Sequence, residues 1–494
     1  MEKFKPLRQA VKPMIELSVE SRLAEIEKRI PGGHLVRLIQ EVVFRLDTSQ
    51  IEAKYSFMGQ KPYHPKLLLS ILFYGYATGV RSSRALEERC NRDDYYKYLM
   101  QYHTPDHRTI SDFRKDNIEW INKCFIEILM MFRLLGYKNV GKVYIDGTKV
   151  KANASADRTR DKKGYVKWLG IIKEEVDEIL KEVEKIDKEE DESCRLKTKQ
   201  EEERLRKRMS NCKYLERKIK GALAVMEREK LEKINLTDND ARNMKKGGSK
   251  DIRPSYNCQA GVTEEGVITV SAVVKEANDI NQLGVTIEQN ESNTGERIRE
   301  VTADSGYSSY ENYEYLEKRG INGYVPDQYF KEYKAGEYKK EERRYHYTNF
   351  KYKELEDMYI CPEGKKLVYW KKRIGEGKRR RWKHKVYRGV SCRECGKRSL
   401  CTRLERRELL IDVREPLLQK MRKKLESEEG RLKYMLRQCL IEPVFGHLKY
   451  NIGYTHFLLR GIEKVNGEFK LMCIGWNLKK MLKLGYTPEM VANL

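Results

Sequence analysis

Apolar residues recur at helical spacing from the N-terminus to about residue 136, so this first part of the chain is predicted to be a set of helices. Within it, residues 106–115 have the pattern of a helix start, with Asp106 as the N-cap. The apolar side chains of this helix share one face, which leaves Arg108 and Arg114 away from that face. One interpretation is the DNA-reading helix of a helix-turn-helix; the other is a solvated basic helix packed against its neighbours.

Beyond this region, short apolar runs bounded by turns alternate with helical stretches. Strands are predicted at residues 141–150, 256–262, 267–274, 298–304 and 323–326, and helices at residues 281–291, 310–319 and 405–484. The second and third strands are separated only by a short turn, which indicates a hairpin. This order of elements favours an α/β fold with a mixed sheet flanked by helices.

A long charged segment, residues 165–233, follows the first strand candidate. Its apolar residues recur at alternating steps of three and four, and opposite charges are spaced four apart on the remaining faces. Two helices forming an antiparallel coiled coil, with a turn near residues 187–197, account for this pattern most simply. Dimerisation through the same seam is the alternative.

The chain therefore divides into a helical region, a core in two parts and two insertions. The predicted bounds are 1–136 for a helical DNA-binding region, 137–330 for the first part of the core, 165–233 for the helical insertion within it, 331–404 for a basic, aromatic and cysteine-bearing insertion, and 405–494 for the C-terminal part of the core.

Composition points to a polyanionic partner. The 494 residues carry a formal net charge of +25, which favours nucleic acid, with an anionic membrane surface as the rival. No apolar run approaches the roughly 20 residues of a spanning helix, and no export signal is evident at the N-terminus. The eleven cysteines, an odd number, indicate reduced thiols. We therefore expect a soluble, cytoplasmic protein that binds nucleic acid.

Three acidic residues occupy positions suited to metal chemistry. Asp146 and Asp304 each end an apolar strand-like run, and Glu442 precedes Pro443 within a basic helical stretch. Taken singly, each fits an ordinary turn or cap residue. Taken together, two carboxylates at the rim of a sheet and a third from a helix can hold a pair of divalent cations, Mg²⁺ or Mn²⁺, and act on a phosphodiester.

Four cysteines form a second group. Cys361 is followed by a proline, Cys392 and Cys395 form a Cys-x-x-Cys pair, and Cys401 lies six residues further on. Four soft ligands in a basic loop suit a structural zinc knuckle, although Cys361 lacks a near partner. Unliganded buried thiols are the alternative.

In their order, these motifs resemble the DDE transposases of bacterial insertion sequences, in particular the group with an inserted cysteine cluster. The resemblance spans most of the chain, and its sequence motifs are Tyr-Ile-Asp-Gly-Thr-Lys, Gln-Ala-Gly-Val, Glu-Ala-Asn-Asp, Ala-Asp-Ser-Gly-Tyr, the cysteines and Glu-Pro-Val-Phe-Gly. It implies a ribonuclease-H-like core, with Asp146, Asp304 and Glu442 as the metal-binding triad. It also implies strand cleavage by water and joining of the freed 3′-hydroxyl to target DNA.

The resemblance also suggests which residues meet DNA. Tyr434, Arg437, Glu442 and Lys449 are similar to the Y-R-E-K signature of related transposases, although four residues here separate Arg437 from Glu442, one more than in the commonest version. The residues expected to contact DNA are Arg108, Arg114, Lys149, Tyr307, Tyr434, Arg437, Lys449 and Arg460.

The implied partners are double-stranded DNA, as the terminal inverted repeats of the element and as the target, and a second copy of the chain in a synaptic homodimer. Two alternatives stay open from the sequence. One is a catalytically inactive, basic DNA-binding or regulatory protein. The other is a nuclease of the same fold that does not transfer strands.

Overall fold

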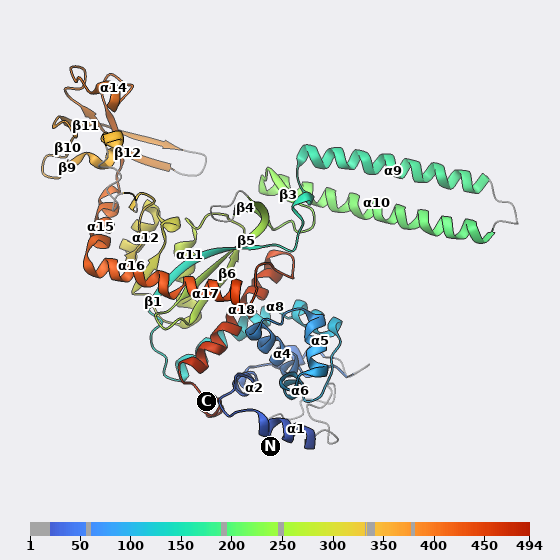
Figure 1. Ribbon diagram of the computed structural model, residues 1–494. Coiled ribbons are helices and arrows are strands. Elements are labelled where there is room, and N and C mark those ends of the chain that lie inside the picture. The colour runs from blue at the N-terminus through green and yellow to red at the C-terminus, as the bar shows by residue number, and fades with distance from the viewer. Residues whose placement is uncertain are drawn as a thin grey trace.

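A mixed β-sheet lies at the centre of the molecule, with a helical region below it and two insertions that project away from it (Figure 1). The computed structural model describes residues 20–55, 61–188, 195–245, 251–330, 332, 341–376 and 381–494. Within these residues, no helix is both long enough and apolar enough to cross a membrane.

The central sheet has six strands in the order β4-β5-β1-β7-β8, with β6 paired to the outer edge of β5. The strands are β1 (Lys142–Lys151), β4 (Arg242–Lys245), β5 (Ile252–Val262), β6 (Ile268–Val274), β7 (Glu300–Ala303) and β8 (Asn322–Tyr324). β1 runs antiparallel to β5 and parallel to β7, and β7 runs parallel to β8. The predicted hairpin is confirmed as β5–β6, and the mixed sheet is compatible with a ribonuclease-H-like core.

Successive side chains of β1 point to opposite faces of the sheet. Val143 and Ile145 pack against α11 (Gln282–Thr294), α12 (Tyr310–Arg319) and α15 (Glu415–Glu426). Tyr144 packs on the opposite face, in the core shared by α17 (Glu442–Gly446), α18 (Ile462–Lys483) and the N-terminal helices. Because the period of a strand is two, Asp146 emerges on the same face as Tyr144.

The N-terminal region is helical, as predicted. Its helices are α1 (Glu20–Arg29), α2 (Leu35–Arg45), α3 (Ser49–Glu52), α4 (Pro65–Thr78), α5 (Ser83–Arg92), α6 (Asp94–Met100), α7 (His107–Asp116) and α8 (Ile118–Leu134). Asp106 caps α7 as expected, since its carboxylate accepts a hydrogen bond from the Thr109 amide at 2.6 Å. α4 and α8 pack directly on α18, so the first and last parts of the chain share one hydrophobic core.

Two long helices are inserted between β1 and β5. α9 (Lys162–Lys188) and α10 (Arg195–Glu229) lie side by side and extend from the body on a small base, β2 (Thr159–Asp161) paired with β3 (Lys233–Asn235) (Figure 1). An apolar seam that includes Ile172 and Ile219 joins the two helices. The turn predicted near residues 187–197 lies mainly outside the described residues.

A second sheet forms between β8 and α15. Its order is β13-β12-β11-β10-β9, from β9 (Lys351–Lys353), β10 (Met358–Ile360), β11 (Lys366–Glu376), β12 (Arg381–Gly389) and β13 (Glu408–Asp412). The prediction of helix from residue 405 is wrong at β13, where Leu409 and Ile411 alternate into the small core of this sheet. Helices resume with α15, α16 (Glu428–Leu440) and α17, which a turn of π-helix, His447–Asn451, continues.

Candidate active site

Asp146 and Asp304 are neighbours because of strand pairing. Ile145 in β1 lies opposite Ala303 in β7, and the two aspartates are the next residue in each strand direction. Adjacent strands lie about 5 Å apart, so the register alone brings the two carboxyl groups together. Asp304 then caps the short turn Ser305–Tyr307, and its Oδ1 accepts a hydrogen bond from the Gly306 amide at 2.8 Å.

Arg437 connects the third acid to this pair. Its guanidinium, on α16, lies 3.2 Å from Asp146 Oδ2 through Nη1 and 3.2 Å from Glu442 Oε1 through Nη2. The Arg437 side chain is 8% exposed, whereas that of Glu442 is 52% exposed, so Glu442 stands at the open side of the site. The structure therefore brings Asp146, Asp304 and Glu442 around one guanidinium.

The pKa values at the site are shifted because several carboxylates surround a single guanidinium. Burial raises the pKa of Asp146 to about 7; the charge of Arg437 opposes this rise, and those of Asp304 and Asp279 add to it. Burial also disfavours the charged guanidinium, but the surrounding carboxylates outweigh burial and raise the pKa of Arg437. A further positive charge at this position would relieve the repulsion among the acids.

Asp279, which the sequence did not single out as a site residue, is the fourth acid of this group. Its Oδ1 accepts hydrogen bonds from Asn257 Nδ2 at 2.7 Å and from Gln259 Nε2 at 2.6 Å. A Cβ on Gly147 would lie 2.4 Å from the same oxygen, so only glycine allows this close approach. The feature of the sequence that could have identified Asp279 is its position shortly after a predicted strand, which it shares with Asp146 and Asp304.

The residues expected to contact DNA differ in exposure. The prediction for Arg114 is wrong: it is buried in the N-terminal core and donates to Tyr76 Oη at 3.1 Å and to the Arg81 carbonyl at 2.7 Å. The prediction for Tyr307 is also wrong, because its ring is fully buried and its hydroxyl donates to Gln259.

Three of the other expected DNA contacts, Arg437, Tyr434 and Lys449, lie at or near the acids. Arg437 is engaged with Asp146 and Glu442 and packs by the half-buried ring of Tyr434. Lys449 Nζ donates to Thr148 Oγ1 and, at 2.9 Å, to the Lys149 carbonyl.

The remaining expected contacts are spread over the surface. Lys149 reaches the Lys245 carbonyl at 3.3 Å. Arg108 and Arg460 are exposed, at two separate places.

The four cysteines of the insertion converge on one small cavity of about 20 Å³. Cys361 accepts a hydrogen bond from the Lys365 amide at 3.3 Å, and the Cys395 amide donates to the Cys392 carbonyl at 3.2 Å. Cys361 therefore lies in one tight turn and the Cys392–Cys395 pair in another, and both turns border the cavity. All four are free thiols. With the side chains as they stand, however, no three His, Cys, Asp or Glu residues in the described part of the chain are grouped tightly enough to hold a metal ion, either here or at the acids.

Two family models match this chain. The model described as "Transposase DDE domain" matches residues 360–482, which include the cysteines, Arg437 and Glu442, and the model described as "Transposase domain (DUF772)" matches residues 24–116, which include α2 to α7. No curated protein and no solved structure matches the chain.

Both models describe transposase domains, and they cover the N-terminal helices and the C-terminal part of the chain that carries Arg437 and Glu442. More closely, the chain carries domains typical of the DDE transposases of bacterial insertion sequences, and the resemblance seen in its sequence is confirmed.

Proposed function

We propose that this transposase cuts and joins DNA with Asp146, Asp304 and Glu442 as its DDE triad. The observation that carries the proposal is the single guanidinium of Arg437, which contacts Asp146 and Glu442 and is influenced by Asp304. Acids more than a hundred positions apart in the chain thus meet at one point, beside the end of β7. Neither family model extends to Asp146 or Asp304, so their assignment rests on this geometry.

The acids fit divalent metal ions by donor chemistry. DDE transposases generally use such ions, and carboxylate oxygens are the ligands that Mg²⁺ and Mn²⁺ prefer. Asp146, Asp304 and Glu442 would hold two ions, with Arg437 releasing Asp146 and Glu442 to make room. Bound ions would activate the attacking oxygen and stabilise the leaving oxygen.

The reaction consists of two displacements at phosphorus. In the first, water attacks the phosphodiester at the element end, the bond from phosphorus to the 3′ oxygen breaks, and a 3′-hydroxyl is freed. In the second, this hydroxyl attacks a phosphodiester of the target, and the 3′ oxygen of the target leaves. Lys149, Arg437 and Lys449 would neutralise phosphates beside the acids. Two copies of the chain would cut the two ends in one synaptic complex.

A nicking assay on DNA carrying the ends of the native element tests the proposal. Asp146→Asn removes one ligand charge without changing the shape of the side chain, so we expect cleavage in Mg²⁺ to fall at least a hundredfold while end binding persists. Asp177→Asn, on the exposed face of α9, is the matched control and should cleave like the wild type. Cleavage at the wild-type rate by Asp146→Asn would remove the triad.

The same assay separates the alternatives. A wild-type protein that binds ends but never nicks them, in Mg²⁺ or in Mn²⁺, is a DNA-binding protein without catalysis. One that nicks ends but never joins the 3′-hydroxyl to a second duplex is a nuclease. Nicking that persists in EDTA would contradict the metal requirement.

The cysteines are proposed to hold a structural Zn²⁺ ion. Thiolates at the ends of two tight turns, facing one cavity, are the donor set that tetrahedral zinc favours. The ion would hold the turn after β10 to the turn after β12, and it would take no part in the cleavage reaction.

A further inference from the structure

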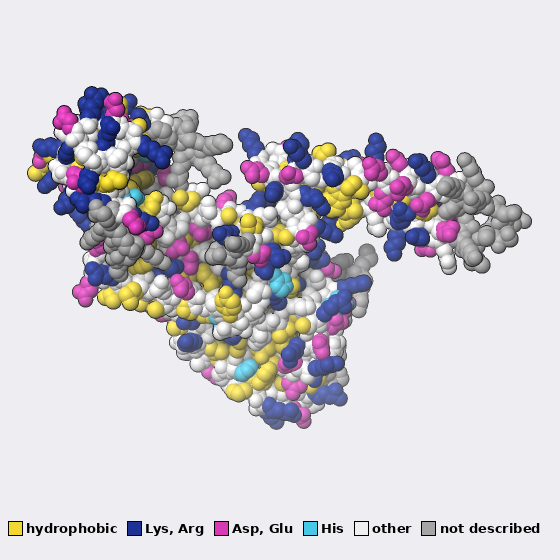
Figure 2. Space-filling model, turned by 45° about the horizontal axis from the view of Figure 1, so that its top comes forward, with side chains coloured by type: hydrophobic (Ala, Val, Ile, Leu, Met, Phe, Trp, Pro, Cys, Tyr) yellow, Lys and Arg dark blue, Asp and Glu magenta, His cyan; other side chains and the backbone are white. Residues whose placement is uncertain are grey.

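A positively charged cleft lies at the base of the α9–α10 hairpin. It has a volume of about 770 Å³ and forms where α10, the segment that follows β1, and the loop 455–460 meet. Its lining includes four cationic side chains and no Asp or Glu; the cations are Lys151, Arg158, Lys218 and Arg460. Dark blue side chains gather where the hairpin joins the body in Figure 2.

The four cations of this cleft have no acidic partner in the part of the chain that the structure describes. Among the described residues, no ion pair involves any of the four cations, whereas Arg206, Arg208 and Lys220 of α10 each pair with a glutamate of the same helix or of α9. Tyr214 is half exposed on α10, beside these cations. A hydrogen bond from Lys218 lowers the pKa of the Tyr214 hydroxyl, and the charges of Arg158 and Arg460 lower it further.

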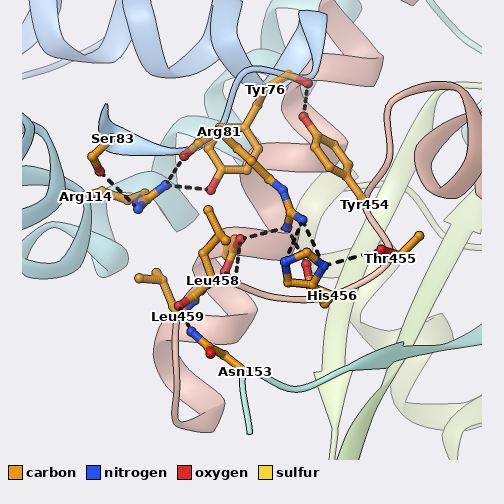
Figure 3. A network of polar contacts seen from close by, with 11 residues as sticks. Tyr76, Arg81, Ser83, Arg114, Asn153, Tyr454, Thr455, His456, Leu458 and Leu459 are labelled. Carbon is orange, nitrogen blue, oxygen red and sulfur yellow. Dashed lines mark hydrogen bonds and ion pairs between the residues drawn. The ribbon is translucent and has the colours of Figure 1, made fainter. Parts of the chain in front are cut away.

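One wall of the cleft is held rigidly from behind (Figure 3). The buried carboxylate of Glu468, on α18, accepts hydrogen bonds from the amides of Leu458 and Leu459, at 2.9 Å each for the closer oxygen. Arg81, which follows α4, donates to the His456 carbonyl from the other side.

The same wall also fixes the position of Arg460. Asn153 Nδ2 donates to the Leu458 carbonyl at 2.6 Å, and the Asn153 carbonyl accepts from Arg460 Nε at 2.8 Å. A cation whose position is set in advance loses less freedom when it binds a phosphate.

We propose that this cleft binds the sugar–phosphate backbone of a DNA duplex, so that the base of the α9–α10 hairpin is part of the DNA-binding surface. The proposal rests on the proposed function only for DNA as the partner. A strand advances about 3.3 Å per residue, so Lys151 lies about 16 Å along β1 from Asp146. That span equals about five base pairs of a duplex, so one duplex could reach both the acids and the cleft.

A neighbouring cavity extends the same surface toward the N-terminal helices. It shares the loop 455–460 through Leu458, and its lining includes Arg84 at the start of α5, Arg108 and the inner side chain of Arg114 on α7, and one acid, Asp112. The exposed Arg108 predicted from the sequence therefore belongs to this path, at its far end from the hairpin.

The test compares two double variants that remove the same charge from neighbouring parts of the molecule. The cleft variant, Arg158→Gln with Lys218→Gln, removes two of the four cations that line the cleft. Lys213→Gln with Arg217→Gln is the matched control, because both residues lie on α10, are exposed and do not line the cleft. Binding of a labelled generic duplex is measured by fluorescence anisotropy in EDTA, over a series of salt concentrations.

Each phosphate contact contributes about 0.9 to the slope of log affinity against log salt. We expect the cleft variant to bind more weakly at every salt concentration and the magnitude of its slope to decrease by about 2. The control should keep the wild-type slope. Equal slopes for the cleft variant and the wild type, or an equal fall in the control, would overturn the proposal. Thermal melting of both variants confirms that each is folded.

Failure of this inference is distinct from failure of the proposed function. EDTA excludes cleavage from the binding measurement, so a protein that never nicks DNA can still show the expected loss of slope. Conversely, the protein could nick element ends while its cleft variant keeps the wild-type slope. That outcome would exclude the cleft as a DNA-binding surface and leave the proposed chemistry in place.

Discussion

At the scale of single residues, Arg437 determines how the acids of the site lie close to one another. A buried carboxylate without a counter-charge is costly, and Asp146 has Asp304 beside it. The guanidinium supplies one donor to Asp146 and one to Glu442, which keeps the two acids on either side of it. The rise in the pKa of Asp146 shows that one guanidinium does not fully offset burial and the other acids.

Gly147 gives the first prediction at this scale. A Cβ there would meet Asp279 Oδ1 and Gln259 Nε2, each at 2.4 Å, so Gly147→Ala should displace Asp279 and destabilise the fold by about 1–3 kcal/mol. Urea unfolding measures the change. Gly170→Ala is the control, since nothing lies within 4 Å of its Cβ and a helical alanine should stabilise by about 0.5–1 kcal/mol. A neutral Gly147→Ala would contradict the described packing.

Lys470 gives a pH-dependent prediction. It is 6% exposed on α18 and donates to the Ser271 carbonyl at 3.1 Å, and burial lowers its pKa from 10.5 to about 8. Between these two values the unfolded chain binds the proton more tightly, so the stability of the wild type should rise with pH in that window, relative to Lys470→Met.

The expected change in that difference is on the order of 3 kcal/mol between pH 7 and pH 10.5. Chemical denaturation of both proteins at each pH measures it, and the comparison cancels the titration of all other groups. A difference in stability that stays constant with pH would show that Lys470 is not buried as described.

Some of the site could be predicted from residue patterns and some could not. Asp146 and Asp304 each end an apolar run, and strand pairing makes them neighbours. Asp279 follows β6 in a loop, and amides from β5 aim it, which only the tertiary structure reveals. Arg114 has the spacing of an exposed basic residue, yet the Tyr76 hydroxyl and the Arg81 carbonyl draw it into the core.

At the scale of elements, local signals were sufficient where they were strong. α12 spans Tyr310–Arg319, the range that its pattern predicts, and the β5–β6 hairpin follows from two β-rich runs around a turn. The second sheet could not be predicted, because β11 and β12 carry many lysines and arginines, and only one strand face packs on a small core. Their strand character depends on pairing with each other, which a local pattern does not contain.

The cysteine insertion carries the prediction at this scale. If Zn²⁺ joins its turns, Cys395→Ser should lower the zinc content to below one ion per chain and loosen the second sheet, because three ligands hold the ion less tightly. Elemental analysis and limited proteolysis of the insertion measure both effects. Cys439→Ser, an exposed free thiol on α16, is the control and should bind zinc like the wild type. Equal zinc in both variants, or none in the wild type, would exclude the site.

At the scale of the whole molecule, a buried ionic network connects the N-terminal helices to α18 and to the loop 455–460. Glu468 is fully buried and lies 3.5 Å from Arg81, which also contacts His456. Figure 3 shows Arg81 beside His456. Arg81 lies in the region that one family model matches, and His456 and Glu468 lie in the region that the other matches. These contacts would make the two regions unfold together.

Glu468→Gln tests this coupling. The variant leaves Arg81 buried with a neutral partner and weakens the bonds to the Leu458 and Leu459 amides, so we expect a loss of about 3–5 kcal/mol. Calorimetry should show one unfolding transition in the wild type and either a lower or a divided transition in the variant. Glu463→Gln, exposed on the first turn of α18, should leave the melting curve unchanged.

The shared core of the two chain ends bears on how the protein is made. α2 and α4 pack against α18 and α19 (Pro488–Ala492), which are synthesised much later than they are, and Arg45 donates to the Val491 carbonyl. The ribosome releases α2 and α4 long before α18 and α19 are synthesised, so α2 and α4 stay incompletely packed until those helices emerge. Any chain cut short before α18 would lack not only its final helices but also a stable beginning.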